Sequence, residues 1–284
     1  MDILKIDYKA ADAAVRLAKS LKETGFAVLE NHPLNPQELV DLRTAWDQFF
    51  ASDAKMNFHF ENDQETFLGY YPYNLEKAKG YNAANLMEYY HYNLNDKNAL
   101  PADLLAQTKH VFAQGYEIAK QLCTWLDEQT PADIKKDFEC SLQDAIKDSE
   151  TSIMRIIHYP ALQGNEEQGA IRAAEHEDID FLTVLPAANR PGLQAKDIEG
   201  NWHSIDTNPG NIVINAGDML QMMTKGYYKS TTHRVINPTT QAENKPRFST
   251  PMFFQARNNV RLSEDYTAKE YLRERFKENN IVKK

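Results

Sequence analysis

The chain has 284 residues, a formal net charge of −9 and a sequence pI near 5.4. That length is enough for one large domain with a sizeable core. Charges of both signs are interspersed, which leaves no basic stripe for phosphates, and no apolar run approaches the roughly 20 residues of a membrane span. The first residues do not resemble a signal peptide, so we expect a cytoplasmic protein. We also expect a monomer that binds neither nucleic acid nor a membrane. Cys123 and Cys140 are expected to be reduced core residues.

Helices dominate the predicted N-terminal half. Residues 3–8 alternate like a short strand, and apolar residues at helical spacing predict three helices, over 10–24, 36–50 and 103–126. Gly25 predicts the C-cap of the first helix, and a buried strand and a turn follow it. We interpret His32 as a residue of that turn.

From residue 151 the pattern changes from helical to extended. Short strands are predicted over 152–160, 209–218 and 219–224, with a hairpin at Glu199-Gly200. Gly, Pro, Asn and Asp residues separate these short strands and predict turns between them, which favours two facing antiparallel sheets. The expected fold is mainly β with flanking helices: a double-stranded β-helix (jelly roll) core with N-terminal α-helices.

We expect one continuous domain with three regions. Residues 1–150 form the N-terminal helical and substrate-side region, residues 151–262 the jelly-roll core, and residues 263–284 a C-terminal helix.

The motif with the clearest chemistry is His176-x-Asp178, at the start of an apolar run over 174–186 that we interpret as one strand. Alternate residues of a strand share a face, so the imidazole and the carboxylate are offered to one point. His233 precedes another short apolar segment and is a candidate third ligand. Two histidines and a carboxylate on one face of a metal suit Fe(II) and leave positions open. Asp218, directly after Gly217, is interpreted as a turn residue.

A second pair, Arg247 and Ser249, also shares a strand face. A guanidinium fork and a hydroxyl in that arrangement suit a clamp on the far end of a dicarboxylate. One His-x-Asp arises often by chance, so the weight of the prediction rests on the ordered set of three motifs.

Taken together, these motifs resemble the non-haem Fe(II)/2-oxoglutarate-dependent dioxygenases, in the isopenicillin N synthase-like branch also called the iron/ascorbate oxidoreductase family. The resemblance extends from about residue 3 to 262, and 265–276 is similar to the family's closing helix. It implies Fe(II) on His176, Asp178 and His233, with 2-oxoglutarate and oxygen as co-substrates; ascorbate is a further reductant that it allows. It also implies that Tyr159 assists Arg247 and Ser249, and that a small organic substrate is oxidised, by default hydroxylated, with release of succinate and CO2.

The chain departs from the family pattern at several positions. Ile157 replaces an asparagine near the co-substrate, and its side chain offers no hydrogen bond. The segment 87–90 lacks the family's lysine. Glu177 is expected to point away from the metal, whereas Asp180, where the family commonly has glycine, is expected to contact solvent or an amine of the substrate.

Substrate choice is assigned to the tyrosine-rich segment 67–92. Amphipathic rings suit a pocket that holds a partly polar organic molecule and excludes water. Four candidate substrate residues follow: Tyr71, Tyr73, Tyr89 and Tyr90. The competing interpretation is that these rings pack the N-terminal helices against the barrel.

Two other functions remain open at this point. Some relatives keep the iron but use the Arg-x-Ser pair to hold their own substrate's carboxylate, without 2-oxoglutarate. A catalytically silent jelly-roll binding module is the alternative outside enzymes. Zinc hydrolysis fits poorly, because no Glu or His near the triad has the spacing of a general base.

Overall fold

The computed structural model describes residues 1–62, 68–77, 81, 83–95, 100–205 and 208–278. Within these residues the strands are β1 (Lys5–Asp7), β2 (Phe26–Glu30), β3 (Gly69–Tyr71), β4 (Glu88–Tyr92), β5 (Ile153–Tyr159), β6 (Ala173–His176), β7 (Leu182–Pro186), β8 (Leu193–Lys196), β9 (Trp202–Ser204), β10 (Ile212–Ala216), β11 (His233–Val235), β12 (Arg247–Ser249) and β13 (Met252–Phe254). The α-helices are α1 (Ala13–Thr24), α2 (Pro36–Ala51), α3 (Ala102–Gln129), α4 (Ala132–Lys135), α5 (Leu142–Ile146), α6 (Asp218–Met223) and α7 (Ala268–Glu278). Two 3-10 helices, Asp53–Phe58 and Phe60–Asn62, follow α2.

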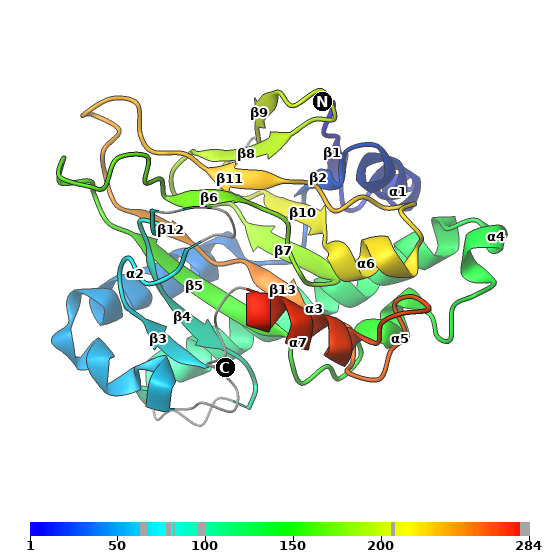
Figure 1. The fold of residues 1–284 in the computed structure, drawn as a ribbon, viewed down its shortest axis with the longest axis horizontal. Coiled ribbons are helices and arrows are strands. Elements are labelled where there is room, and N and C mark those ends of the chain that lie inside the picture. The colour runs from blue at the N-terminus through cyan, green and yellow to red at the C-terminus, as the bar shows by residue number, and fades with distance from the viewer. Residues whose placement is uncertain (63–67, 78–80, 82, 96–99, 206–207, 279–284) are drawn as a thin grey trace.

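The strands form two sheets, as Figure 1 shows. The larger has the order β1-β2-β10-β7-β13-β5-β4-β3, with β12 also paired to β5, and the smaller has the order β6-β11-β8-β9. Strands that precede residue 151 therefore hydrogen-bond in the same sheet as strands that follow it. The predicted jelly roll with N-terminal helices is confirmed.

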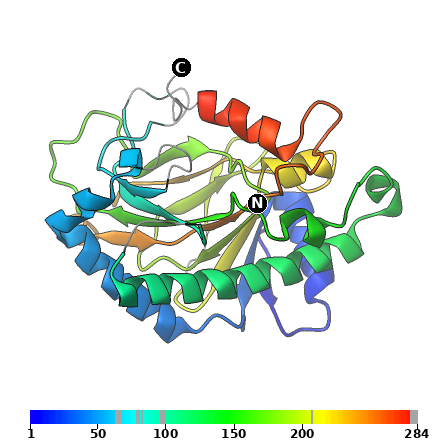
Figure 2. The same cartoon turned by 90° about the horizontal axis from the view of Figure 1, so that it is seen from below.

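Helices cover the larger sheet on the side away from the smaller one. In Figure 2, α1, α2 and α3 lie together below the sheets, whereas α7 lies above them. The packing is close: a Cβ at Gly115 of α3 would lie 2.2 Å from the sulfur of Met252 on β13. Trp46 of α2 is fully buried, and its indole donates to the Thr108 hydroxyl of α3 (3.0 Å). This side holds the main hydrophobic core.

Most predicted elements are found within about three residues of their expected bounds. The three long helices are present, and Gly25 ends α1 in the left-handed conformation (φ 73°) that favours glycine. The hairpin around Glu199-Gly200 joins β8 to β9. His32 lies in the turn after β2, where its Nε2 is 2.8 Å from the carbonyl oxygen of Gly210. Among the described residues, no helix is long and apolar enough to cross a membrane.

The prediction of one strand over 174–186 is wrong. β6 ends at His176, β7 begins at Leu182, and the two strands belong to different sheets. The intervening residues carry the chain from one sheet to the other. Two backbone carbonyls of this segment accept hydrogen bonds from α6 and not from a neighbouring strand. Asp178 O accepts from Asp218 N (2.8 Å), and Asp180 O accepts from Met219 N (2.9 Å).

The expected strand over 219–224 is also wrong, because this segment forms α6. Its buried residues Met219, Leu220 and Met223 have helical spacing. A short apolar run of this kind fits a strand or a helix equally well, and here the tertiary environment decides.

Candidate active site

Three side chains converge where β6 and β11 lie side by side. His176 and His233 are register partners across these strands, and their ring centroids are 4.4 Å apart. Asp178 Oδ1 lies 3.8 Å from His176 Nε2 and 3.7 Å from His233 Nε2. One ligand atom from each residue falls within 4.8 Å of the others. The structure therefore brings together the three side chains predicted to hold a metal.

Hydrogen bonds orient each of these groups. Nδ1 of His176 is 2.8 Å from the carbonyl oxygen of Ala174, and Nδ1 of His233 is 3.1 Å from that of Thr231. A carbonyl can only accept, so in both rings Nδ1 carries the proton and the Nε2 lone pair faces the shared point.

The far oxygen of Asp178 is held just as firmly. Thr183 Oγ1 and Asn215 Nδ2 donate to Asp178 Oδ2 at 2.6 Å and 2.8 Å. These donors are register partners on β7 and β10 of the larger sheet. Oδ1 is therefore left toward the two imidazoles. Neither donor could be recognised from the sequence, because the role of each depends on strand register.

The ionisation states suit a cation. Burial and the nearby His176 lower the pKa of His233, which favours the neutral imidazole that binds metals. Burial alone would raise the pKa of Asp178, but the adjacent His233 and His176 and the hydrogen bonds it accepts hold it below its usual value. Two neutral imidazoles and a carboxylate are the donor set of a facial Fe(II) site.

The triad lines a cavity of about 980 Å³ that also reaches Arg247, Ser249 and Tyr159. Arg247 on β12 pairs with Tyr159 on β5, and its guanidinium lies 5.0 Å from that ring's centroid. The side chain is 1% exposed, and its Nε donates to the carbonyl of Arg190 (3.2 Å). Nη1 is buried without a hydrogen-bond partner among the described residues. The three residues predicted to bind the co-substrate therefore line the same cavity as the triad, and their role in binding stays a prediction.

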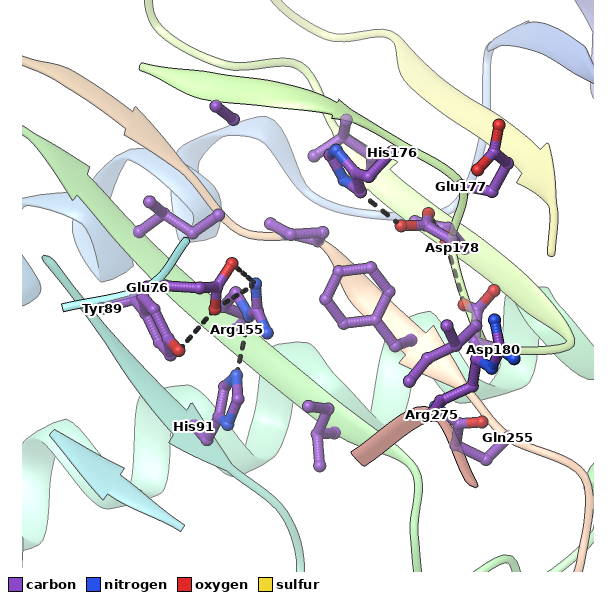
Figure 3. A pocket seen from close by; sticks show the side chains of 18 of the residues that line it. Glu76, Tyr89, His91, Arg155, His176, Glu177, Asp178, Asp180, Gln255 and Arg275 are labelled. Atoms are coloured by element: carbon purple, nitrogen blue, oxygen red, sulfur yellow. Dashed lines mark hydrogen bonds and ion pairs between the residues drawn. The ribbon is translucent and has the colours of Figure 1, made fainter. Parts of the chain in front are cut away.

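A second polar cluster lines the same cavity, away from the triad (Figure 3). Glu76 accepts from the Tyr89 hydroxyl at 2.6 Å and lies 3.4 Å from Arg155 Nη1. Arg155 Nε donates to His91 Nε2 at 2.7 Å. Sequence reasoning missed this cluster. Strand alternation on β4, which puts Tyr89 and His91 on one face, was the available signal.

The four tyrosines proposed for the substrate separate into two pairs. Tyr71 and Tyr89 line the cavity, with their rings stacked at 4.5 Å. Tyr90 does not: it points to the opposite face of β4 and packs on Trp46 (5.0 Å). Its predicted substrate contact is wrong for that reason. Tyr73 is 38% exposed in the loop after β3 and is not part of the cavity wall, so that expectation is also corrected.

Asp180 differs from its expected environment. It is 1% exposed, so the predicted contact with solvent is wrong, but it lines the cavity, and the alternative contact with an amine of the substrate stays a prediction. The chain leaves β6 before this residue, and Thr183 Oγ1 lies 2.9 Å from its Oδ2. Burial and the neighbouring Asp178 raise its pKa well above the usual value, which favours the neutral acid. Glu177 is exposed and bonds to Thr232.

The C-terminal helix forms part of the cavity wall. Five residues of α7 contribute, namely Lys269, Leu272, Arg273, Arg275 and Phe276. The Tyr271 hydroxyl donates to Asp218 Oδ2 (2.5 Å) and ties α7 to the start of α6. Asp218 is therefore no member of the triad. The helix was predicted, but its place at the cavity was not.

Comparison with known proteins decides the family. The profile described as the 2OG-Fe(II) oxygenase superfamily matches residues 150–256, and the N-terminal profile of the non-haem dioxygenase in morphine synthesis matches 2–115. A crystal structure of a candidate oxygenase from Shewanella oneidensis is 42% identical, covers 99% of this chain and 100% of its own, and has a TM-score of 0.88. The chain belongs to the 2OG-Fe(II) oxygenase superfamily.

Two more distant relatives of this chain also belong to the comparison. Gibberellin 2-beta-dioxygenase 2 from Arabidopsis thaliana is 25% identical over 81% of this chain and 69% of its own length. A Neurospora crassa protein solved in complex with alpha-KG has the same fold, with a TM-score of 0.79 at 22% identity over 96% of this chain and 95% of its own. The predicted enzyme class, iron and 2-oxoglutarate are confirmed, and the 2-oxoglutarate-free alternative is not favoured. Ascorbate, monomeric state and cytoplasmic location stay predictions.

Proposed function

We propose that His176, Asp178 and His233 hold the Fe(II) of this oxygenase. The observation that carries the proposal is the convergence of two Nε2 lone pairs and Asp178 Oδ1 within 4.8 Å on the wall of a large cavity. Three ligands on one side leave the remaining metal positions to the cavity. When bound, the iron supplies the redox chemistry that couples decarboxylation of 2-oxoglutarate to oxidation of the substrate.

The co-substrate's far carboxylate is assigned to Arg247 and Ser249, with Tyr159 beside them. The unpartnered Nη1 of Arg247 gives a buried donor for a charge-assisted hydrogen bond. Leu185, Val235 and Ile157 supply apolar walls. Because isoleucine replaces the family's asparagine at 157, the carboxylate depends more heavily on the arginine.

The substrate is assigned to the other polar cluster of the cavity. Tyr71 and Tyr89 offer ring faces, while Glu76 and Arg155 offer an acceptor beside a donor. This combination suits a partly polar small molecule. The Neurospora crassa protein has been solved with thymine, and the Arabidopsis thaliana relative is named for a gibberellin, both small organic molecules. Hydroxylation is the proposed outcome.

Coupled turnover tests this function. Anaerobically iron-loaded protein is given 2-oxoglutarate, oxygen and pools of small metabolites, and succinate and oxidised product are both quantified. Succinate should form only with iron, and the right substrate should bring the ratio of product to succinate near one. A protein that forms no succinate with any pool, although it binds iron and 2-oxoglutarate, would instead be the silent binding module.

Variants of the tyrosines locate the substrate once it is known. Tyr89→Phe removes the hydroxyl that holds Glu76 and should lower the ratio of product to succinate, because a badly held substrate lets the oxidant decay unproductively. Tyr90→Phe on the opposite face of β4 is the matched control and should leave the ratio unchanged. If both variants gave the same ratio of product to succinate, the substrate would bind elsewhere in the cavity.

A further inference from the structure

A second arginine lies close to the proposed co-substrate clamp. Arg172, the residue before β6, is 2% exposed, and Arg247 is 1% exposed. Nη2 of Arg172 donates to the carbonyl of Lys245 (2.8 Å), two residues before Arg247 in the chain, and burial together with the charge of Arg247 lowers the pKa of Arg172. Nε of Arg172, like Nη1 of Arg247, is buried without a hydrogen-bond partner in the described part of the chain.

No carboxylate of the described residues forms an ion pair with either arginine, although the chain has 41 acidic residues. Buried charges in proteins are normally paired, because removing an ion from water costs several kcal/mol. Two adjacent cations without an acid are therefore an uncompensated positive site. A bound anion is the simplest partner for them.

The position of Arg172 limits how it can act. Its Nη2 donates to the carbonyl of Lys245 (2.8 Å), and its backbone N–H donates to Asn237 Oδ1 (3.0 Å). Arg247 and Tyr159 belong to the cavity wall, whereas Arg172 does not. Its influence on a ligand must therefore pass through its charge and not through contact.

We propose that Arg172 is a second cationic group of the co-substrate site, which strengthens binding of the far carboxylate electrostatically without touching it. This inference rests on the proposed function. Within the described residues no acid offsets this charge, and we expect it to destabilise the fold when the dicarboxylate is not bound. Binding of the dicarboxylate supplies the missing negative charge, so stability and affinity are linked through this residue.

Three substitutions separate charge from hydrogen bonding. Arg172→Lys keeps the charge, Arg172→Gln keeps a donor for Lys245 O without the charge, and Arg172→Met removes both. Arg190→Gln is the control, because the Arg190 side chain is exposed and the residue contacts Arg247 through its backbone carbonyl, which the substitution keeps. Calorimetric titration of 2-oxoglutarate into anaerobic Fe(II)-loaded protein measures affinity, and thermal unfolding of the free protein measures stability.

We expect the Gln and Met variants to bind 2-oxoglutarate about tenfold more weakly or worse, with Lys within about threefold of wild type and the control within about twofold. KM for 2-oxoglutarate should rise while kcat at saturation changes little. The free Gln variant should unfold at the wild-type temperature or above it, since an unpaired buried charge has been removed. Weak binding of 2-oxobutanoate, which lacks the far carboxylate, should be unaffected by any of the changes.

Wild-type affinity in the Gln and Met variants would overturn the inference and leave the proposed function intact. The inference would also be overturned if the Gln variant kept wild-type affinity for 2-oxoglutarate and the Lys variant did not. That result would show that Arg172 acts only through its hydrogen bond to the Lys245 carbonyl. Failure of the wild-type protein to bind 2-oxoglutarate would overturn the proposed function and this inference together.

Discussion

At the scale of single residues, the hydrogen bonds to Asp178 Oδ2 determine how this carboxylate is presented. Thr183 and Asn215 hold one oxygen, and the other faces both imidazoles. The histidines are fixed in the same way through Nδ1. These hydrogen bonds restrict the orientations of all three side chains, which lowers the entropic cost of binding a metal.

Replacing any of His176, Asp178 or His233 by alanine should lower Fe(II) affinity by more than about tenfold, since loss of outer partners alone can cost that much. The fold should persist, because the cavity face carries little of the main core. Metal analysis after anaerobic loading gives the result. Full occupancy in all three variants would be incompatible with the triad.

Arg247→Leu should raise KM for 2-oxoglutarate strongly and leave iron affinity within about twofold. Lysine should rescue poorly, because a point charge cannot reproduce a guanidinium fork, and a lost charged hydrogen bond costs about 1.5–3 kcal/mol. Succinate release across a 2-oxoglutarate titration measures this. An unchanged half-saturation point would place the dicarboxylate away from β12.

At the scale of elements, the crossing between β6 and β7 shapes the site. The crossing carries Asp178 and Asp180, and it packs against Gly217 at the start of α6. A Cβ at 217 would lie 2.1 Å from Asp180 Oδ1 and 2.3 Å from its carbonyl oxygen. The backbone there is ordinary (φ −98°), so the requirement for glycine is steric.

Gly217→Ala should therefore displace the crossing, destabilise the protein by about 1–3 kcal/mol and reduce Fe(II) binding. Gly115→Ala is the control, because its Cβ would meet Met252 on the core side. That variant should lose stability without losing iron. Chemical unfolding combined with metal analysis separates the two effects, and equal iron binding in both variants would contradict the account.

Strand β4 also carries a buried ion cluster on its helix-facing side. Glu88 accepts from Lys55 (2.8 Å), from Tyr70 (2.5 Å) and from His158 Nδ1 (2.8 Å). Burial alone would raise the pKa of Glu88, but these donors outweigh it and hold the pKa below its usual value. Its stabilising effect is therefore present above the unfolded pKa of about 4.3 and is lost as pH falls through the folded pKa.

Glu88→Gln should lower the free energy of unfolding by about 2–4 kcal/mol at pH 7, with the difference from wild type narrowing below about pH 4. Glu117→Gln, at an exposed pair with Lys120 on α3, should change stability little at either pH. Denaturant unfolding at both pH values checks the sign. A gap that widened on acidification would show that the folded pKa is raised.

Elements with strong periodicity or cap signals were predictable, and the ordered motifs also brought His233 to His176 and Asp178, but contacts between distant elements without such a motif were not predictable. His-x-Asp was visible because its spacing is local, but the pairing of His176 with His233 depends on strand register. Tyr90 was misplaced because aromatic residues occupy both faces of β4, so alternation could not show which face meets the cavity. Arg155 and Glu76 meet only in the folded chain.

At the scale of the whole molecule, the cavity joins parts of the chain that are far apart in sequence. The smaller sheet supplies the histidines, the larger sheet supplies Arg247, Arg155 and the donors to Asp178, and α7 adds the C-terminal wall. The proposed iron site therefore lies on a cavity to which both sheets contribute.

A crystal structure of the protein grown anaerobically with Fe(II) and 2-oxoglutarate would show the metal and co-substrate sites together. We expect iron bound by Nε2 of His176, Nε2 of His233 and Oδ1 of Asp178, with the far carboxylate of 2-oxoglutarate on Arg247 and Ser249 and the Glu76–Arg155 cluster free to take the substrate. Iron bound by other residues, or 2-oxoglutarate with its far carboxylate on Arg155, would contradict this expectation.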